Sequence, residues 1–79
     1  MPFEMKLPPL GDEAPDEAEV SFWYVEEGEA VAEGQDMVEM ITDKAAFTVP
    51  SPVAGTVRSI VAGEGDKVRV GEVMAIVEA

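Results

Sequence analysis

The sequence predicts an all-β fold in which two small antiparallel sheets fold over one another as a flattened barrel or sandwich. Seven glycines and six prolines divide the 79-residue chain into segments of about six residues, too short for a helix of normal length. The chain also repeats itself at an offset of 37 residues, where residues 27–34 align with 64–71. The half-repeats cover about 20–41 and 57–78 of a single domain, 1–79. An approximate twofold relation between the halves would place the segment joining them at one end and the termini at the other.

The individual elements follow from short β-rich runs between turn residues. We expect the paired glycines, 28 with 65 and 34 with 71, to form turns that need positive φ. Pro50 and Pro52 end one strand and stiffen the crossover to the second half. Strands are expected near residues 3–7, 18–25, 30–31, 37–42, 45–50, 55–61, 67–69 and 73–77.

The core is expected to draw on both halves. Four consecutive large apolar residues at 22–25 cannot all face one small core, so we expect a bulge or a partly exposed aromatic there, with Trp23 packed. The predicted core residues are Val20, Val31, Val38, Met40, Phe47, Val49, Val57, Val68, Met74 and Ile76.

A lone cation marks the candidate functional site. From Leu7 to Asp43 the chain has twelve carboxylates and no Lys or Arg, and Lys44 follows directly. Because β-rich runs flank them, Asp43 and Lys44 are predicted to form a two-residue hairpin tip. Such a tip would hold the lysine in solvent on a short stalk, where an enzyme could modify it. On spacing alone, an ordinary polar turn is the favoured interpretation of these residues, because Asp is common in turns and Lys on surfaces; the repeat and the motifs described below reverse that preference.

Composition favours a carrier over an enzyme. With no His and no Cys, the chain cannot build a Ser-His-Asp, Cys-His or His-zinc site, and it has no calcium-loop spacing, so no metal site is predicted. A Schiff-base lysine needs its neutral form, which the neighbouring Asp43 disfavours. No catalytic residue is predicted, and Lys44 is interpreted as a modification acceptor.

The formal net charge of −12 bears on partners and location. It argues against binding to nucleic acid or an anionic membrane surface, and any protein partner should present basic patches. The N-terminus has no apolar signal region, and no run approaches the roughly 20 apolar residues that span a bilayer. We therefore expect a soluble protein of the bacterial cytoplasm or an equivalent reducing compartment. The isolated domain is expected to be a monomer.

Several short motifs occur in the order found in lipoyl domains, and the chain resembles most the lipoyl domain of a 2-oxo acid dehydrogenase acyltransferase component. The match runs from about Phe3 to Val77. It rests on Lys6-Leu7-Pro8, Glu17-Ala18-Glu19-Val20, Trp23, Val25-Glu26-Glu27-Gly28, Thr42-Asp43-Lys44-Ala45, Val49-Pro50-Ser51-Pro52 and Ala54-Gly55.

This resemblance implies the barrel-sandwich fold and a covalent lipoate on Lys44, attached by a lipoate ligase or lipoyltransferase that recognises the flanking Asp43 and Ala45. The lipoyl-lysine would be a swinging arm carrying acyl groups and reducing equivalents between the dehydrogenase (E1), acyltransferase (E2) and dihydrolipoamide dehydrogenase (E3) components. The domain itself would supply no catalytic group.

The chain departs from the family pattern at two places. One is the loop that in the family lies beside the lipoyl-lysine and helps the dehydrogenase component discriminate its carrier. This loop is one residue longer than usual here, with Glu13 where Gly is common; its residues are Gly11, Asp12, Glu13, Ala14, Pro15 and Asp16. Ile41 stands where Glu is frequent. The chain is expected to be the excised N-terminal domain of an acyltransferase, with a free-standing carrier as the other possibility.

Three other carrier or binding functions are weighed against the lipoyl carrier. Biotin carriers usually have Met on both sides of the modified lysine, so Asp43 and Ala45 favour lipoate. The glycine-cleavage H protein is longer and differs around its lysine. An unmodified β interaction module would keep the repeat without needing Lys44.

Overall fold

The computed structural model describes residues 1–10 and 16–79, which form eight β-strands and no helix. Every predicted strand is present, with its ends within two residues of the expected positions. The strands are β1 (Pro2–Lys6), β2 (Glu17–Trp23), β3 (Ala30–Val31), β4 (Asp36–Ile41), β5 (Ala46–Pro50), β6 (Gly55–Ile60), β7 (Lys67–Arg69) and β8 (Val73–Glu78).

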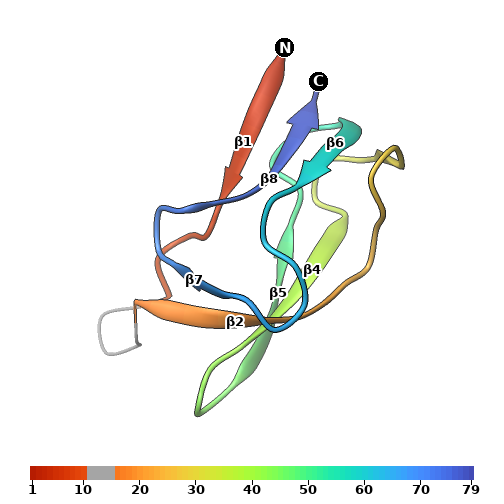
Figure 1. Ribbon diagram of the computed structural model, residues 1–79. Helices are drawn as coiled ribbons and strands as arrows, with labels where there is room; N and C mark the ends of the chain where they lie inside the picture. The colour runs from red at the N-terminus through yellow and green to blue at the C-terminus, as the bar shows by residue number, and fades with distance from the viewer. Residues whose placement is uncertain (11–15) are drawn as a thin grey trace.

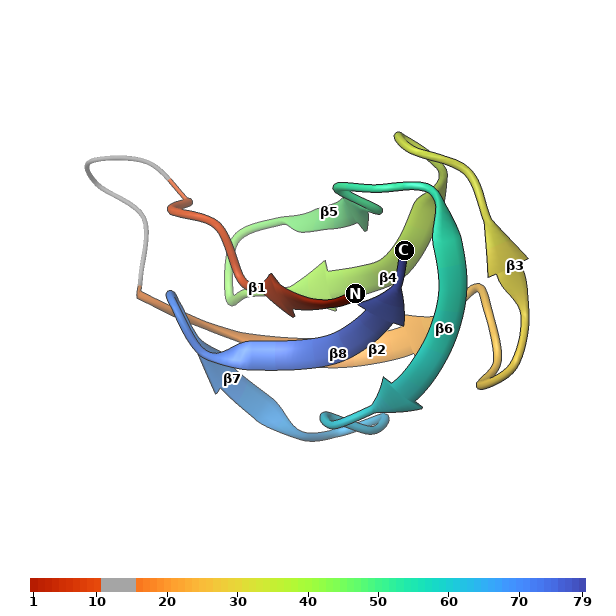
Figure 2. The same cartoon turned by 90° about the horizontal axis from the view of Figure 1, so that it is seen from above.

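The strands form two four-stranded antiparallel sheets, ordered β1-β8-β6-β3 and β5-β4-β2-β7. The sheets are not closed into a barrel, so of the predicted flattened barrel or sandwich the structure adopts the sandwich (Figures 1 and 2). Each half of the chain lends a short strand to the other: β3 pairs with β6, and β7 pairs with β2. The two halves are therefore intertwined and share one core.

Backbone contacts repeat at the same offset of 37 residues as the sequence. The amide of Gly28 donates to the carbonyl of Val57 at 2.7 Å, and that of Gly65 donates to the carbonyl of Val20 at 2.8 Å. All four paired glycines have positive φ, between 84° and 90°, as their turns were predicted to require. The same turns thus fold twice and place the two halves in equivalent positions.

The β-bulges repeat as well. One residue of β2, Ser21, has no partner on β4, and Arg58 of β6 has none on β8. A second pair of irregularities places Met37 of β4 and Met74 of β8 as extra residues opposite β5 and β1. A bulge reverses the inward and outward alternation of every residue beyond it.

Among residues 1–10 and 16–79, the buried core contains sixteen apolar residues, most of them on strands of the two sheets. Eight of the ten predicted core residues are among them, and Phe47 is partly buried against the same cluster. The prediction of Ile76 was wrong: it is only partly buried, and its neighbours Ala75 and Val77 are 0% exposed. The extra residue Met74 is itself buried, which shifts the alternation in β8 by one position.

The aromatic run behaves as expected, with a bulge at Ser21 and two exposed rings. Phe22 and Tyr24 are 38% and 44% exposed and pack edge to face, with ring centroids 4.7 Å apart. Trp23 points the other way, packs against the core and donates its indole N–H to the carbonyl of Ala62 at 2.7 Å. The packing role predicted for Trp23 is confirmed.

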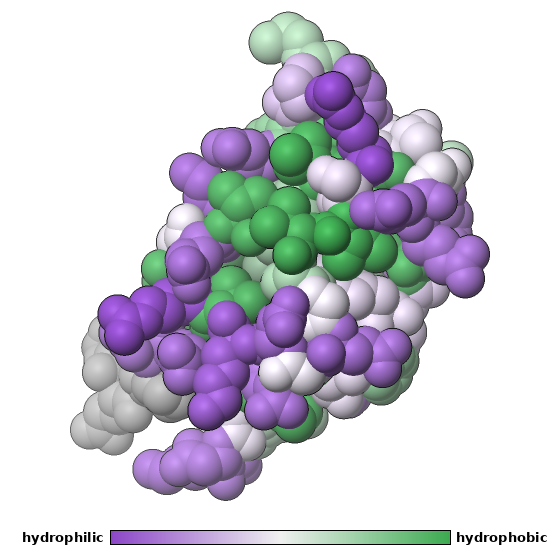
Figure 3. Space-filling view, viewed as in Figure 1, coloured by the Kyte–Doolittle hydropathy of each residue, from purple (hydrophilic) through white to green (hydrophobic). Residues whose placement is uncertain are grey.

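The β4–β5 tip and the chain termini occupy opposite ends of the elongated molecule, which measures 33 × 21 × 17 Å (Figure 1). The termini lie together, because the amino group of Met1 donates to the carbonyl of Ala79 at 2.9 Å. In the space-filling view, apolar side chains cross the middle of the face, and polar side chains predominate near the end that carries the tip (Figure 3). The arrangement predicted from the repeat, with tip and termini at opposite ends, is confirmed.

Candidate functional site

The tip of the β4–β5 hairpin is a two-residue turn, as predicted. Ile41 and Ala46 are the last cross-strand pair, and the amide of Thr42 donates to the carbonyl of Ala45 at 2.8 Å, which leaves Asp43 and Lys44 at the apex. Neither apex residue has positive φ, so the turn is not one of the primed types that usually close such hairpins.

The hydroxyl of Thr42 stabilises this less common turn. Its Oγ1 accepts the backbone N–H of Lys44 at 3.3 Å and of Ala45 at 3.2 Å. It also lies 3.3 Å from the carbonyl of Ala45, to which it can donate. The side chain thereby replaces a backbone bond that a primed turn would make, and it fixes the direction in which the apex leaves the sheet.

Lys44 is exposed, together with the flanking Asp43 and Ala45, whereas the hairpin behind them is anchored in the core. Met40 of β4 is 0% exposed and Val49 of β5 is 4% exposed. Among residues 1–10 and 16–79, one ion pair lies within 4 Å, and it does not involve Lys44. An accessible primary amine is therefore held at the end of a stalk that is fixed at its base.

The two sides of the tip differ in chemistry. On one side, Asp43 lines a cleft whose other polar residues are mostly carboxylates; its walls are Asp16, Glu17, Ala18, Glu19, Ile41, Thr42 and Lys67. On the other side, Lys44 lines a groove of about 390 Å³ with mainly apolar walls: Pro8, Pro9, Leu10, Thr42, Ala45, Phe47, Thr48, Val49 and Pro50. Thr42 belongs to both, so the hairpin tip forms the ridge between them.

Most of the predicted recognition loop, Gly11, Asp12, Glu13, Ala14 and Pro15, lies outside the described residues. Its flanks are described and both lie at the tip, because Leu10 lines the apolar groove and Asp16 lines the acidic cleft. The exposed Asp16 is fixed through its carbonyl, which accepts the amide of Val70 at 2.8 Å.

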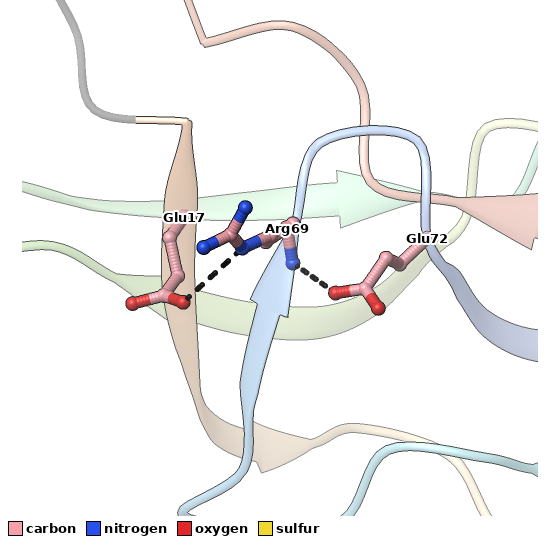
Figure 4. Close-up of polar contacts among 3 residues, drawn as sticks. All are labelled: Glu17, Arg69 and Glu72. Atoms are coloured by element: carbon pink, nitrogen blue, oxygen red, sulfur yellow. Dashed lines mark hydrogen bonds and ion pairs between the residues drawn. The ribbon is translucent and has the colours of Figure 1, made fainter.

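An ion pair follows directly after Asp16. Glu17 of β2 and Arg69 of β7 lie on paired strands with Oε2 and Nε 4.0 Å apart, and the amide of Arg69 donates to Oε1 of Glu72 at 2.7 Å (Figure 4). The two side chains are 42% and 70% exposed, so we expect the ion pair to contribute less than about 1 kcal/mol. The hydrogen bond from Arg69 to Glu72 closes the turn that follows β7.

Metal-binding clusters and membrane-spanning helices are both absent from the described part of the chain. Residues 1–10 and 16–79 contain no group of three or more side chains placed to hold a metal ion. Over the same residues, no helix is long and apolar enough to cross a membrane.

Sequence reasoning found the tip and missed the groove beside it. The groove forms between Pro8–Leu10 and β5, which are about 40 residues apart in the chain. The consecutive prolines and Leu10 in an otherwise acidic half were the only local signal. Ile41, the residue noted as unusual, is half-buried and lines the acidic cleft.

Comparison with known proteins agrees with this geometry. Residues 4–77 match the model of the Biotin_lipoyl family, described as "Biotin-requiring enzyme". The chain is 47% identical over its whole length to the dihydrolipoyllysine-residue succinyltransferase component of the 2-oxoglutarate dehydrogenase complex of Bartonella vinsonii subsp. berkhoffii, of which it covers 19%. It is 37% identical, again over its whole length, to the dihydrolipoyllysine-residue acetyltransferase component of the pyruvate dehydrogenase complex of Staphylococcus aureus strain Mu50, covering 18%. The chain thus spans about a fifth of the length of these relatives.

Two solved structures are similar to the whole sandwich. The lipoyl domain of the 2-oxoglutarate dehydrogenase complex of Azotobacter vinelandii has a TM-score of 0.75 at 30% identity, covering 96% of this chain and 95% of that one. Urea carboxylase of Kluyveromyces lactis has a TM-score of 0.82 at 17% identity, covering 99% of this chain and 6% of that one, and at this identity shows the fold alone. The chain therefore belongs to the Biotin_lipoyl family, and within it to the lipoyl domains.

Proposed function

We propose that Lys44 carries lipoate as an amide on its Nζ and that the domain moves acyl groups and reducing equivalents between the active sites of a 2-oxo acid dehydrogenase complex. The observation that carries this proposal is the position of Lys44. It is an exposed amine at the apex of a core-anchored hairpin, in a chain that belongs to the lipoyl domains.

The residues at the tip are compatible with lipoate attached to Lys44. The amine is reachable from solvent, and the groove beside it offers apolar walls to an aliphatic arm. When attached, the dithiolane supplies the redox and acyl-carrying chemistry. The protein supplies position: a tether of this kind raises the effective concentration of the arm at each active site it reaches.

The proposed partners are a lipoate ligase or lipoyltransferase and the dehydrogenase (E1), acyltransferase (E2) and dihydrolipoamide dehydrogenase (E3) components. The names of the relatives support a place in such a complex. Asp43 and Ala45 flank the acceptor and would be read by the attaching enzyme. The acidic cleft beside them favours partners that present Lys or Arg.

Intact mass tests the proposal directly. The protein is incubated with a lipoate ligase, ATP and lipoate, and in parallel with a biotin ligase, ATP and biotin. We expect one lipoyl increment on the wild-type chain and on Lys67→Arg, a matched exposed lysine, and none on Lys44→Arg. A lipoyl increment on Lys44→Arg, or none on a folded wild-type chain, would contradict the proposal.

The biotin incubation addresses the second candidate function. The matching family model has the description "Biotin-requiring enzyme", and urea carboxylase of Kluyveromyces lactis shares the fold. A biotin increment on Lys44 without a lipoyl increment would make the chain a biotin carrier. A third outcome is that neither ligase adds mass to the folded protein. If a measured interaction then also persists without Lys44, the chain would be an unmodified binding module.

We further propose that residues 11–16 help a dehydrogenase component recognise its carrier. The support is the position of the loop's two flanks, Leu10 and Asp16, on either side of the tip. Replacing Glu13→Gly and deleting one loop residue should change the rate of reductive acylation by the cognate dehydrogenase severalfold while leaving lipoylation intact. Equal acylation rates before and after the change would remove the loop from recognition.

A further inference from the structure

The groove beside Lys44 has walls that are held in place by the packing of the domain. Its walls are mainly Pro8, Pro9, Leu10, Phe47, Val49 and Pro50, and its volume of about 390 Å³ is within the usual range for small-molecule pockets, roughly 300–1,000 Å³. Val49 is 4% exposed, and Leu10 and Phe47 pack against the core, so the packing of the domain holds these walls in place. The polar side chains in the lining are the hydroxyls of Thr42 and Thr48 and the amine of Lys44.

We propose that this groove is an intramolecular binding site for the lipoyl arm of Lys44, which rests there between visits to partner enzymes. The inference rests on the proposed function. The ligand class is a neutral aliphatic chain ending in a cyclic disulfide, and its point of attachment is itself part of the groove wall.

The direction of β5 allows such an arm to lie along the groove. The strand leads away from the tip from Ala46 to Pro50, and Phe47, Thr48 and Val49 line the groove in succession. At about 3.3 Å per residue, this part of β5 is within reach of an arm that starts at Lys44, and the partly exposed Phe47 supplies apolar surface there. Because tethering gives an effective concentration of about 1 mM or more, an affinity too weak to bind free lipoamide would still dock the arm.

Modification itself determines whether docking is favourable. The ammonium of unmodified Lys44 would lose hydration in an apolar groove, and such a cost keeps lysine heads in water. Amide formation removes the charge and extends the side chain with apolar groups. The acidic cleft across the ridge of Thr42 attracts the cation and has no such attraction for the neutral arm. The groove therefore discriminates the loaded arm from the free lysine.

Nuclear magnetic resonance of the lipoylated domain tests this inference, after intact mass has shown one lipoyl group on Lys44. We expect nuclear Overhauser effects between the arm and the side chains of Leu10, Phe47 and Val49, and methyl shift changes at Leu10 and Val49 that the unmodified protein does not show. A second readout is reduction of the dithiolane by a small phosphine. Because the rate follows the undocked fraction, we expect it to be at least about twofold slower than in free lipoamide.

Matched variants separate the groove from general effects. Leu10→Ser removes one apolar wall, and Thr48→Glu places a carboxylate beside the groove at an exposed position outside the core. Both should weaken the arm contacts and restore the reduction rate. Phe3→Ser, a 42% exposed apolar residue on β1, should change neither.

The outcomes are distinguishable. A lipoyl group on Lys44 with no arm contacts and unaltered methyl shifts would overturn the docking site and leave the carrier function standing. An equal loss of contacts in Phe3→Ser would overturn the assignment to this groove. Absence of the lipoyl increment would instead contradict the proposed function.

Discussion

At the residue scale, Tyr24 reports on the electrostatics of the outer face of its sheet. Partial burial, together with the negative charges of Glu39 and then Asp36, raises the pKa of Tyr24 above its usual 10.0. Because this is the only tyrosine in the chain, its phenolate absorbance can be assigned without ambiguity.

The expected result is an absorbance titration with a midpoint above pH 10. Because the pKa is higher in the folded state, the associated stability is fully present below pH 10 and is lost as pH rises through the folded pKa. Glu39→Gln removes the carboxylate with the larger effect on Tyr24 and should lower the midpoint, whereas Glu33→Gln, in the turn between β3 and β4, should not. A wild-type midpoint at or below 10 would contradict the assignment.

At the scale of the element, the β4–β5 hairpin depends on one hydroxyl for the shape of its tip. Thr42→Val keeps the β-branched shape and removes the acceptor for the amides of Lys44 and Ala45. These bonds are long, so we expect the free energy of local opening at the tip to fall by no more than about 1 kcal/mol. Amide exchange at the two residues should then be up to about fivefold faster.

Hydrogen exchange followed by nuclear magnetic resonance measures this effect. Thr42→Ser retains the hydroxyl and should keep most of the protection. Exchange at the core strand β8 should be unchanged in both variants, since the tip lies outside the core. Unchanged exchange at Lys44 and Ala45 in Thr42→Val would show that the hydroxyl does not hold the turn.

The strands also show where local pattern fails. Alternation located the buried residues of β2 before the bulge, such as Val20, but it chose the wrong residue at the end of β8. The bulge at Met74 is defined by the partner strand β1, which pairs Met5 with Ala75 and Lys6 with Val73. No property of residues 73–78 taken alone records that pairing.

For the molecule as a whole, the formal charge of −12 acts against the compact state. At about 0.01 M salt the Debye length is roughly 30 Å, close to the 33 Å length of the molecule, so its charges repel one another throughout. At about 0.15 M salt the screening length falls to roughly 8 Å. We therefore expect the free energy of unfolding, measured in urea, to rise by roughly 1 kcal/mol between these conditions.

A charge variant provides the control for this prediction. Glu33 is exposed, and Glu33→Lys changes the formal net charge by two units, from −12 to −10. Its stability should depend less on salt than that of the wild type. A wild-type stability that is constant or falls with added sodium chloride would show that self-repulsion is not a significant term.

The sequence by itself determined the strands, the glycine turns and the position of the hairpin tip. These depend on chemistry within a few residues, such as positive φ at Gly28 and Gly65, and on a repeat that is visible in the chain. The tertiary structure alone decided the exchange of β3 and β7 between the halves, the buried face of β8 and the apolar groove beside Lys44. Each of these arises where segments far apart in the chain meet, and the pairing that brings them together is a property of the folded molecule rather than of either segment.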